Sequence, residues 1–547
     1  MTAARATWSV LDTAFGDGSQ FTACWHQWRN DPQRPAMLHY VGIQSAADHY
    51  PWPAEVARFC QDLGSGFHRI LLDDGQVSLT LCIGPLQSML AEQALQADTV
   101  LFDGSDAAWD KWALKALAKL CRRGTLLRAS TPGTLPAALL EDAGFCLNTP
   151  AEPQAPTEYR YDPRWNLTHT RKSHGSATVS RCAVIGAGMA GASVAHVLAL
   201  RGWAVSVLDA CAEPAGGASG LPVGLVVPHV SVDDSPRSRM SRNGTRLMLL
   251  HAQRLLVEGL DWGHTGVMEH RGAPEGDLWH PMAGWIKPAR LVQEWLRHPA
   301  IAFVGNAPVR QLTHNEGVWT LHGDQGQLLA QAEHVVFANA YGCRELLHSM
   351  ASTVELEGDV LAKSDTWQEL HGLLSYGMCP ADPQRAANGM WPTGPVNGDG
   401  SFVPNIHTLQ GLLWFAGSTF ETQTTQVADI AEQHRTNHAR LTSLLPEVGA
   451  ALAPDFAAGT VQAWSATRCA THDRLPLVGP LQTNATPSLW INAGMGSRGL
   501  SFSALCAELL ASQMHGEPLP VEAQLARGLD SMRARRQRRT TTETQTF

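Results

Sequence analysis

The feature that most constrains this chain is a glycine-rich turn that joins an apolar segment to a helix-compatible run. Apolar residues 182–185 are followed by Gly-Ala-Gly-Met-Ala-Gly at positions 186–191, and the run 192–201 is compatible with a helix. A second apolar segment, residues 204–208, ends at Asp209. This order of strand, glycine turn, helix, strand and acid predicts a βαβ unit that binds a dinucleotide.

Each residue of this motif has an expected task. Gly186 permits the tight turn, and Gly188 lets a pyrophosphate approach backbone N–H groups at the start of the helix. Gly191 lets the helix and the strand pack closely. Asp209 stands where an acid can accept hydrogen bonds from both ribose hydroxyls.

Three further segments favour FAD over NAD. The small-residue loop 215–220, which contains Ser219, resembles the loop with which FAD oxidoreductases meet the flavin phosphates and the ribityl chain. Residues 335–340 predict an apolar strand with a small-residue end. Near the end of the chain, residues 468–479 precede residues 489–500, which end in Gly-Ser-Arg-Gly-Leu. In this order the pieces resemble the D-amino-acid-oxidase and glycine-oxidase superfamily, whose FAD domain is split by an inserted substrate domain.

That resemblance implies roles for four residues. Gly499 and Leu500 would lie against the flavin ring, while Arg468 and Arg498 would face the substrate. An enzyme that oxidises an N–CH2–COO group needs a bidentate cation, which holds the carboxylate so that the C–H bond points at the flavin. No side chain is expected to act as a base there, because hydride transfer from a neutral amine needs mainly orientation.

A second glycine motif lies near the amino terminus. Residues 9–21 contain a strand, the acid Asp12 and a turn with Gly16 and Gly18, as in the first motif of an S-adenosylmethionine methyltransferase. Asp12 would orient the methionine amino group, and the glycines would let the cofactor approach. Residues 38–43 supply a second strand at the correct spacing.

Two further residues of the predicted methyltransferase site stand at the ends of neighbouring predicted strands. Gln44 ends the second strand, where an acid would bind the cofactor ribose, so the acceptor is neutral here. Residues 66–81 predict a hairpin with its turn at Asp-Asp-Gly, and residues 100–104 predict a strand that ends at Asp103 in the cleft.

The chain is therefore expected to be an α/β protein with two nucleotide-binding units in tandem. We expect a Rossmann-like methyltransferase domain over 1–150, a linker over 151–180 with three prolines by Pro163, and an FAD oxidoreductase over 181–530 with an inserted α+β substrate domain. Residues 531–547 form a basic polar tail, which we interpret either as a phosphate-contacting segment or as a frayed terminus.

The charge, the cysteines and the apolar segments of the chain indicate which partners, metal sites and locations to expect. A formal charge of -9 gives no overall attraction to nucleic acid, so such a partner requires a local basic patch. The 11 cysteines contain no C-x-x-C pair, which argues against a zinc cluster and a disulfide framework, and we expect no bound metal. No apolar stretch approaches the ~20 residues of a membrane span, and residues 1–12 do not resemble a signal peptide, so we expect a cytoplasmic protein without a membrane partner.

The two halves in this order resemble the MnmC-type tRNA 5-methylaminomethyl-2-thiouridine biosynthesis bifunctional proteins. Besides the nucleotide motifs, the resemblance is carried by residues 25–29, 284–289, 473–476 and 496–500. It implies a tRNA substrate with two reactions on a wobble uridine. The FAD half removes the carboxymethyl group of 5-carboxymethylaminomethyl-2-thiouridine, and the other half methylates the resulting primary amine with S-adenosylmethionine.

Two alternatives stay open at this point. Residues 105–110 replace the proline- and asparagine-containing loop that the family has after the cleft acid, and little sequence precedes Asp12. The chain could therefore be a small-molecule oxidase of glycine or sarcosine type with a vestigial first domain. Alternatively, the first domain could bind tRNA without catalysis. The sequence does not predict an oligomeric state.

Overall fold

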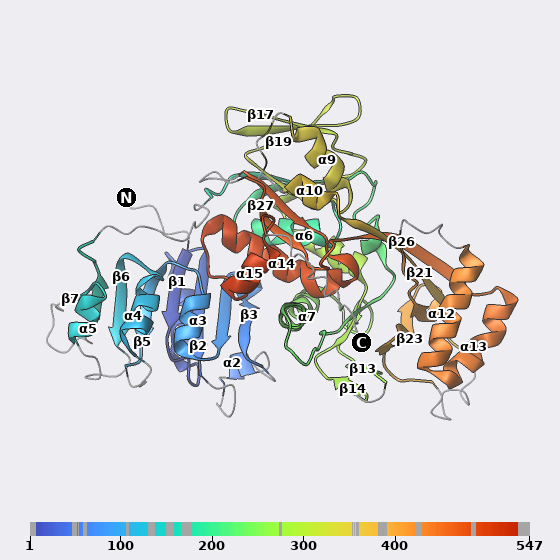
Figure 1. Ribbon diagram of the computed structural model, residues 1–547, viewed down its shortest axis with the longest axis horizontal. Helices are drawn as coiled ribbons and strands as arrows, with labels where there is room; N and C mark the ends of the chain where they lie inside the picture. The colour runs from blue at the N-terminus through green and yellow to red at the C-terminus, as the bar shows by residue number, and fades with distance from the viewer. Residues whose placement is uncertain are drawn as a thin grey trace, which may run out of the picture.

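The computed structural model places two α/β halves side by side (Figure 1). The structure describes residues 7–45, 52, 54–57, 63–104, 109–129, 137–148, 158–165, 177–272, 276–352, 354, 356, 360–380, 391–422, 429–482 and 488–533. Figure 1 shows the amino-terminal half at one end, a central core, and a second sheet at the opposite end of the molecule.

The amino-terminal half is built on one sheet. Its described strands are β1 (Thr7–Asp12), β2 (Met37–Gln44), β3 (Gly66–Leu72), β4 (Val77–Ile83), β5 (Ala97–Phe102), β6 (Cys121–Ala129), β7 (Phe145–Asn148) and β8 (Glu158–Tyr161). Its described helices are α1 (Ser19–Asn30), α2 (Ala54–Ala57), α3 (Leu86–Glu92), α4 (Lys111–Ala118) and α5 (Ala137–Asp142). The strand order is β3-β4-β2-β1-β5-β6-β8-β7.

The centre of this sheet is parallel and doubly wound. β1 pairs in parallel with β2 on one side and with β5 on the other, so the chain changes direction across the sheet at β1. Every residue of β2 is buried, as expected for a strand covered on both faces. Ligands of such sheets bind at the carboxyl ends of the strands at this switch point. The predicted strand at 38–43 and the predicted β3–β4 hairpin are confirmed.

The predicted linker is wrong for part of its length. β8 lies within 151–180, yet it pairs antiparallel with β6 and with β7 inside the first sheet. Tyr159 and Tyr161 are buried while Arg160 is exposed, which is the alternation of a strand covered on one face. Four residues between proline-containing segments are too few to reveal that period in the sequence, and pairing with distant strands decides the outcome.

The central core contains the second βαβ unit. Its sheet has the order β16-β10-β9-β20-β28-β27 among the described strands. Their bounds are β9 (Arg181–Ile185), β10 (Ala204–Leu208), β16 (Ile301–Val304), β20 (His334–Phe337), β27 (Leu477–Pro480) and β28 (Leu489–Ala493). Helices α6 (Met189–Leu200) and α14 (Gly499–His515) are buried for most of their length and share one hydrophobic cluster with β9 and β10.

Further elements surround this core. The described helices are α7 (Pro236–Leu255), α8 (Pro288–Leu296), α9 (Gly342–Met350), α10 (Val360–Ser364) and α15 (Ala523–Leu529). One small sheet contains β11 (Gly224–Val226), β12 (Trp262–Gly263) and β15 (Gly284–Ile286). A second small sheet contains β17 (Gln311–Asn315), β18 (Val318–His322) and β19 (Leu328–Ala332). The last of these sheets stands at the top of the molecule in Figure 1.

The substrate-domain sheet is assembled from two separate insertions. Its described strands are β13 (Val267–Glu269), β14 (Leu278–His280), β21 (Gln368–Met378), β22 (Val396–Gly398), β23 (Gly400–Thr408), β24 (Gly411–Gly417), β25 (Glu421–Thr422) and β26 (Gln462–Ala470). Helices α12 (Ile430–Leu444) and α13 (Pro446–Ala458) accompany it at the right of Figure 1. An inserted α+β domain is what the resemblance implies.

A buried ion network joins the two halves. Arg69 of β3 is fully buried, and its guanidinium lies 3.4 Å from the carboxylate of Glu508 on α14. Arg69 also donates to the carbonyl oxygen of Pro518 at 2.6 Å. Arg201 pairs with Glu508 at 3.2 Å and with Glu517 at 2.7 Å. Breaking one such buried pair leaves an uncompensated charge, so this network holds the two halves in one arrangement.

Within the described residues, no helix combines the length and the apolar character that crossing a membrane requires.

Candidate active sites

The glycine turn of the second half has the geometry that its sequence predicts. Gly186 has a φ of 105°, and a Cβ there would lie 2.7 Å from the carbonyl oxygen of Ala338. A Cβ on Gly191 would lie 1.8 Å from the carbonyl oxygen of Gly186. Gly188 is the N-cap of α6, whose first N–H groups have no partner within the helix. Side chains are thus excluded where the backbone must turn, and the helix start is open to an anion.

Asp209 and Ser219 frame this turn. Asp209 accepts hydrogen bonds from the N–H of Ala187 at 2.6 Å and from the N–H of Cys211 at 2.8 Å. A carboxylate can accept about four hydrogen bonds, so Asp209 retains capacity for ribose hydroxyls. The Ser219 hydroxyl, in the short helix Ala218–Gly220, accepts from the N–H of Met189 at 2.9 Å.

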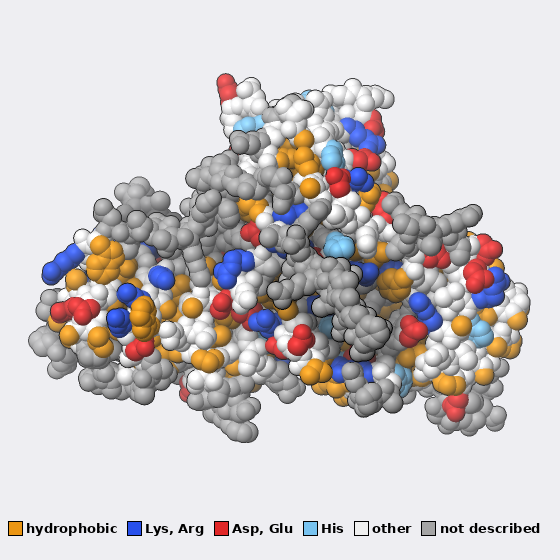
Figure 2. Space-filling view, in the orientation of Figure 1, with side chains coloured by type: hydrophobic (Ala, Val, Ile, Leu, Met, Phe, Trp, Pro, Cys, Tyr) orange, Lys and Arg blue, Asp and Glu red, His pale blue; other side chains and the backbone are white. Residues whose placement is uncertain are grey.

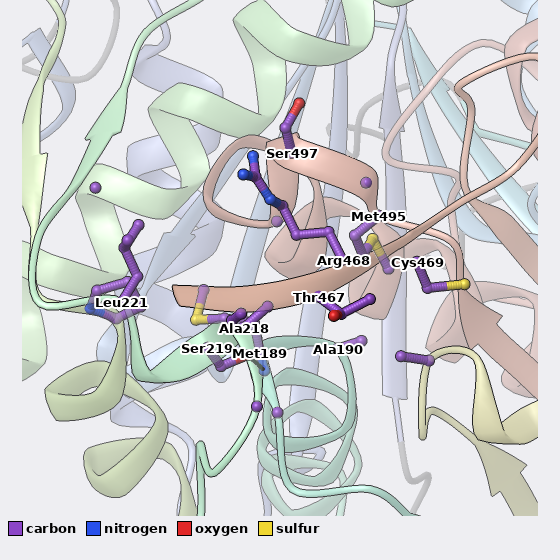
Figure 3. A pocket seen from close by; sticks show the side chains of 18 of the residues that line it. Met189, Ala190, Ala218, Ser219, Leu221, Thr467, Arg468, Cys469, Met495 and Ser497 are labelled. Carbon is purple, nitrogen blue, oxygen red and sulfur yellow. Dashed lines mark hydrogen bonds between the residues drawn. The ribbon is translucent and has the colours of Figure 1, made fainter. Parts of the chain in front are cut away.

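A cavity of about 1020 Å³ opens beside this turn. It extends from the glycine turn to the substrate-domain sheet, and Gly188, Asp209, Ser219, Arg468, Arg498, Gly499 and Leu500 all line it. Figure 3 shows two sides of the cavity, with Met189, Ala190, Ala218 and Ser219 below and Arg468, Met495 and Ser497 above. The volume and the glycine cradle fit FAD, whose pyrophosphate would lie at the start of α6.

Arg468 projects into this cavity from β26. One of its guanidinium nitrogens donates to the Ser418 hydroxyl at 3.1 Å, and the guanidinium carbon lies 4.7 Å from the centre of the Phe420 ring. Burial lowers the pKa of Arg468. Among the described residues, no carboxylate lies within ion-pair distance of this side chain. Arg468 is half-buried, and a partly desolvated cation that lacks an acid partner is less costly when a ligand supplies the anion.

Arg498 presents a second cation to the same space. It ends the short helix Gly496–Arg498 and is the N-cap of α14, which begins at Gly499. Burial lowers its pKa to about 10, with a further contribution from the charge of Arg237. The guanidinium therefore stays charged at neutral pH. Leu500 packs against Gly224, where an added Cβ would approach it to 2.5 Å. The structure thus brings Arg468, Arg498, Gly499 and Leu500 together, as the sequence predicts.

In the first half, the acid predicted to bind the cofactor is buried and hydrogen-bonded within the protein. Asp12 ends β1 and is 2% exposed. It accepts hydrogen bonds from the Tyr40 hydroxyl at 2.6 Å and from the N–H of Ala14 at 3.1 Å. Burial raises the pKa of Asp12 from 3.8 to about 6, although both hydrogen bonds oppose the rise. Asp12 therefore holds the turn and the neighbouring strand together, and its contact with a methionine amino group stays a prediction.

The other predicted residues of this cleft lie at the carboxyl ends of β1, β2 and β5. Gly16 and Gly18 have positive φ values of 56° and 77°, and Gly18 is the N-cap of α1. Gln44 is buried at the end of β2. Asp103 directly follows β5 and is half-buried. Residues 105–108 of the altered loop lie outside the described part of the chain. Gly18 is buried, and its N–H donates to the carbonyl oxygen of Phe15 at 2.9 Å, so the glycines form the turn itself. Their contact with S-adenosylmethionine stays a prediction.

Comparison with known proteins decides the family. The family model described as FAD dependent oxidoreductase matches residues 181–275 and 267–513. A tRNA 5-methylaminomethyl-2-thiouridine biosynthesis bifunctional protein MnmC from Albidiferax ferrireducens is 45% identical over 97% of this chain and 93% of its own length. An MnmC protein from Polaromonas naphthalenivorans is 40% identical over 96% of this chain and 90% of its own length. This chain belongs to the MnmC family.

A solved structure of an oxidase shares its fold with part of this chain. Glycine oxidase from Geobacillus kaustophilus superposes with a TM-score of 0.51 at 17% identity, and the match covers 65% of this chain and 99% of that protein. The resemblance to the MnmC family and the predicted fold class are therefore confirmed, with an FAD oxidoreductase domain in the second half. The roles of individual site residues in this MnmC member stay predictions.

Glu269 is a cavity residue that the sequence patterns missed. It ends β13, and its carboxylate accepts from His280 at 2.7 Å and from Arg271 at 3.3 Å. The hydrogen bond from His280 is the main reason that the pKa of Glu269 is lowered. The short strand carries no motif, and only the pairing of β13 with β22 brings Glu269 to the cavity. Among the described residues, no group of three or more His, Cys, Asp or Glu could hold a metal ion.

The predicted boundary of the basic tail is wrong for its first residues. Ser531 is 1% exposed, and Arg533 makes two hydrogen bonds to Asp473, at 2.8 Å and 3.0 Å. Arg533 also donates to the carbonyl oxygen of Pro476 at 2.7 Å. It is therefore part of the fold rather than a phosphate-contacting tail residue. The remaining arginines of that run, beginning at Arg535, lie outside the described residues.

Proposed function

We propose that this chain modifies the wobble uridine of tRNA in two consecutive reactions. The FAD half removes the carboxymethyl group of 5-carboxymethylaminomethyl-2-thiouridine, and the first half transfers a methyl group from S-adenosylmethionine to the resulting primary amine. The proposal is supported by relatives named as bifunctional proteins of tRNA 5-methylaminomethyl-2-thiouridine biosynthesis, which match this chain over 96% or more of its length. A tRNA substrate also fits the predicted cytoplasmic location, which stays part of the proposal.

The observation that supports the first reaction best is the pair of arginines in the cavity. The substrate group to be removed ends in a carboxylate, and neither Arg468 nor Arg498 has a carboxylate partner among the described residues. Both guanidinium groups are half-buried, and desolvation lowers the pKa of each, so an anion bound beside them would offset that desolvation cost. Guanidinium groups hold carboxylates through paired, charge-assisted hydrogen bonds, which fix the direction of the neighbouring C–H bond.

The chemistry then follows from orientation. Bound FAD supplies a two-electron acceptor for a hydride. Arg468 and Arg498 hold the carboxylate, so that the adjacent CH2 carbon, bonded to the amine nitrogen, is the one presented for oxidation. Loss of a hydride from this carbon and of a proton from nitrogen gives a C=N bond. Hydrolysis of that bond leaves the primary amine on the uridine and releases a two-carbon aldehyde acid.

The primary amine is the acceptor for the second reaction. We assign the cofactor cleft to Asp12, Gly16, Gly18 and Gln44, and the acid beside the acceptor amine to Asp103. Asp103 lies at the carboxyl edge of the sheet, next to the switch point where ligands of doubly wound sheets bind. A carboxylate there orients the amine through a charge-assisted hydrogen bond.

The small-molecule oxidase alternative is less well supported, because the relatives match the first half as well as the second. Nucleoside analysis of tRNA from cells with and without the gene tests the choice. We expect cells without the gene to accumulate 5-carboxymethylaminomethyl-2-thiouridine and to lack the methylaminomethyl product. Unchanged nucleosides, together with turnover of glycine or sarcosine by the purified protein, would contradict the proposal and support the alternative.

A further inference from the structure

Helix α4 has an unusual surface for so acidic a chain. The chain's lysines are Lys111, Lys115, Lys119, Lys172, Lys287 and Lys363, so three of the six fall within nine positions at this helix. Lys111, Lys115 and Lys119 are spaced by four residues and are all exposed, while Ala113, Leu114 and Leu117 face the core. The lysines therefore follow one solvent-facing side of the helix.

An exposed tryptophan lies among these lysines. Trp112 is 55% exposed, so much of its ring faces solvent. The ammonium groups of Lys111 and Lys115 lie 5.0 Å and 5.1 Å from the centre of its ring. In the described part of the chain, none of the three lysines forms an ion pair with a carboxylate. Blue and orange side chains adjoin over the position of α4 in Figure 2.

This surface begins beside the proposed methyl-transfer cleft. The Asp110 carboxylate caps α4 by accepting from the N–H groups of Trp112 and Ala113, each at 2.8 Å. One residue earlier, the Trp109 indole donates to the carbonyl oxygen of Asp103 at 2.7 Å. The first turn of α4 is thereby fixed to the end of β5. Through Trp109, the start of α4 is therefore linked to the residue that we assign to the acceptor amine.

We propose that the α4 face, defined as Lys111, Trp112, Lys115 and Lys119, binds the tRNA substrate. This inference rests on the proposed function. Trp112 would stack on an unpaired base, and the lysines would contact the phosphates on either side. Aromatic rings beside cationic groups are the usual platform for single-stranded nucleic acid, because every base has a stacking face and every linkage has a charge. A chain of net charge -9 needs such a local cationic surface.

Binding measurements on the full-length protein test this assignment. The probe is tRNA from cells that lack the gene, titrated at several salt concentrations. Lys115→Glu/Lys119→Glu should weaken binding at least tenfold at about 0.15 M salt, and the slope of log K against log salt should fall by about 1.4, or about 0.7 per lost phosphate contact. Trp112→Ala should weaken binding about 5- to 150-fold, the range for one stacked base.

Matched controls separate this effect from charge and folding. Arg435→Glu/Arg527→Glu makes the same change in net charge at exposed arginines on α12 and α15, and it should leave tRNA affinity within about twofold. Trp165→Ala removes another exposed tryptophan, 48% exposed, from the first half. Oxidation of the free carboxymethylaminomethyl nucleoside should be unchanged in all four variants, because none of these residues lines the FAD cavity.

The possible outcomes are distinct. Wild-type affinity and salt slope in both α4 variants would overturn the α4 assignment and leave the proposed function standing. The assignment would also be overturned if Trp112→Ala altered the oligomeric state while tRNA binding was unchanged, since the surface would then be a protein interface. If the wild-type protein bound no tRNA at any salt concentration, the proposed function itself would fail.

Discussion

The two nucleotide-binding units of this molecule share a topology but present different surfaces to a ligand. In the FAD half, the turn at Gly188 opens into a large cavity, where Arg468 and Arg498 have no carboxylate partner among the described residues. In the methyltransferase half, Asp12 is 2% exposed and already accepts two hydrogen bonds. A strand–glycine–helix motif therefore fixes the backbone, while the surrounding side chains determine whether polar groups remain available to bind a ligand.

The largest effect should come from filling the glycine turn of the FAD half. A Cβ on Gly188 would lie 3.0 Å from the Ser219 hydroxyl, so Gly188→Leu should obstruct the pyrophosphate and yield nearly colourless protein. Flavin absorbance per mole of folded protein measures the loss. Gly18→Leu is the matched change in the other half, and its flavin content should be normal. Normal flavin content in Gly188→Leu would contradict the placement of the FAD pyrophosphate at this turn.

The second effect concerns the unpaired cations. Arg468→Ala should lower kcat/KM for the carboxymethylated nucleoside by about 30-fold to a few thousandfold, because losing one partner of a buried charge pair costs ~2 to 5 kcal/mol. Flavin content should change little. The matched variant Arg181→Ala breaks an exposed ion pair with Glu333 and should leave turnover unaltered. Unchanged kcat/KM in Arg468→Ala would make that arginine structural and leave Arg498 as the carboxylate ligand.

The third effect is the contribution of Asp12, in the methyltransferase half, to the pH dependence of stability. Folding raises the pKa of Asp12 from 3.8 to about 6, so the folded state binds the proton more tightly than the unfolded state does. The stabilisation from protonation is present below pH ~4 and is lost as the pH rises toward 6. Between pH 5 and pH 7.5 this loss is on the order of 1 kcal/mol. Asp12→Asn should remove it, as measured by denaturant unfolding at both pH values. An identical pH dependence in both proteins would contradict the burial argument.

The smallest effect tests the neutral residue of the methyltransferase cleft. Gln44 stands where the resemblance implies an acid, and a charged acceptor makes hydrogen bonds about twice as strong as a neutral one. Gln44→Glu should therefore tighten S-adenosylmethionine binding by about 1 kcal/mol, or roughly fivefold, in calorimetric titration. FAD content should not respond. Weaker S-adenosylmethionine binding in this variant would contradict the prediction that residue 44 accepts hydrogen bonds from the cofactor ribose.

These two halves also differ in how far the sequence could predict them. The FAD turn is local, since Gly186, Gly188, Gly191 and Asp209 lie within 24 residues and each has a steric or hydrogen-bonding task that the structure reproduces. The same holds for the hairpin of β3 and β4. Local patterns of glycine spacing and strand period carry this information directly.

Features that depend on contacts between residues far apart in the chain cannot be predicted from such local patterns. The sequence predicts a linker over residues 151–180, yet β8 lies within it, because pairing with β6 and β7 sets its place. The sequence also predicts that Arg533 belongs to a tail, although Asp473 and Pro476 hold it in the fold. The contact of Arg69 with Glu508 joins residues 439 positions apart, and no short motif reports such a pair.

The most direct test of the difference between the halves is a time course on tRNA that carries 5-carboxymethylaminomethyl-2-thiouridine. Without S-adenosylmethionine, the purified protein should convert this nucleoside completely to the primary amine. With S-adenosylmethionine, the primary amine should appear first and then be methylated more slowly, because the altered loop after Asp103 and the neutral Gln44 weaken the second site. Methylated product without any accumulation of the amine would contradict the prediction that methylation is the slower step. Persistence of the carboxymethyl group without S-adenosylmethionine would contradict the oxidative role of the FAD half.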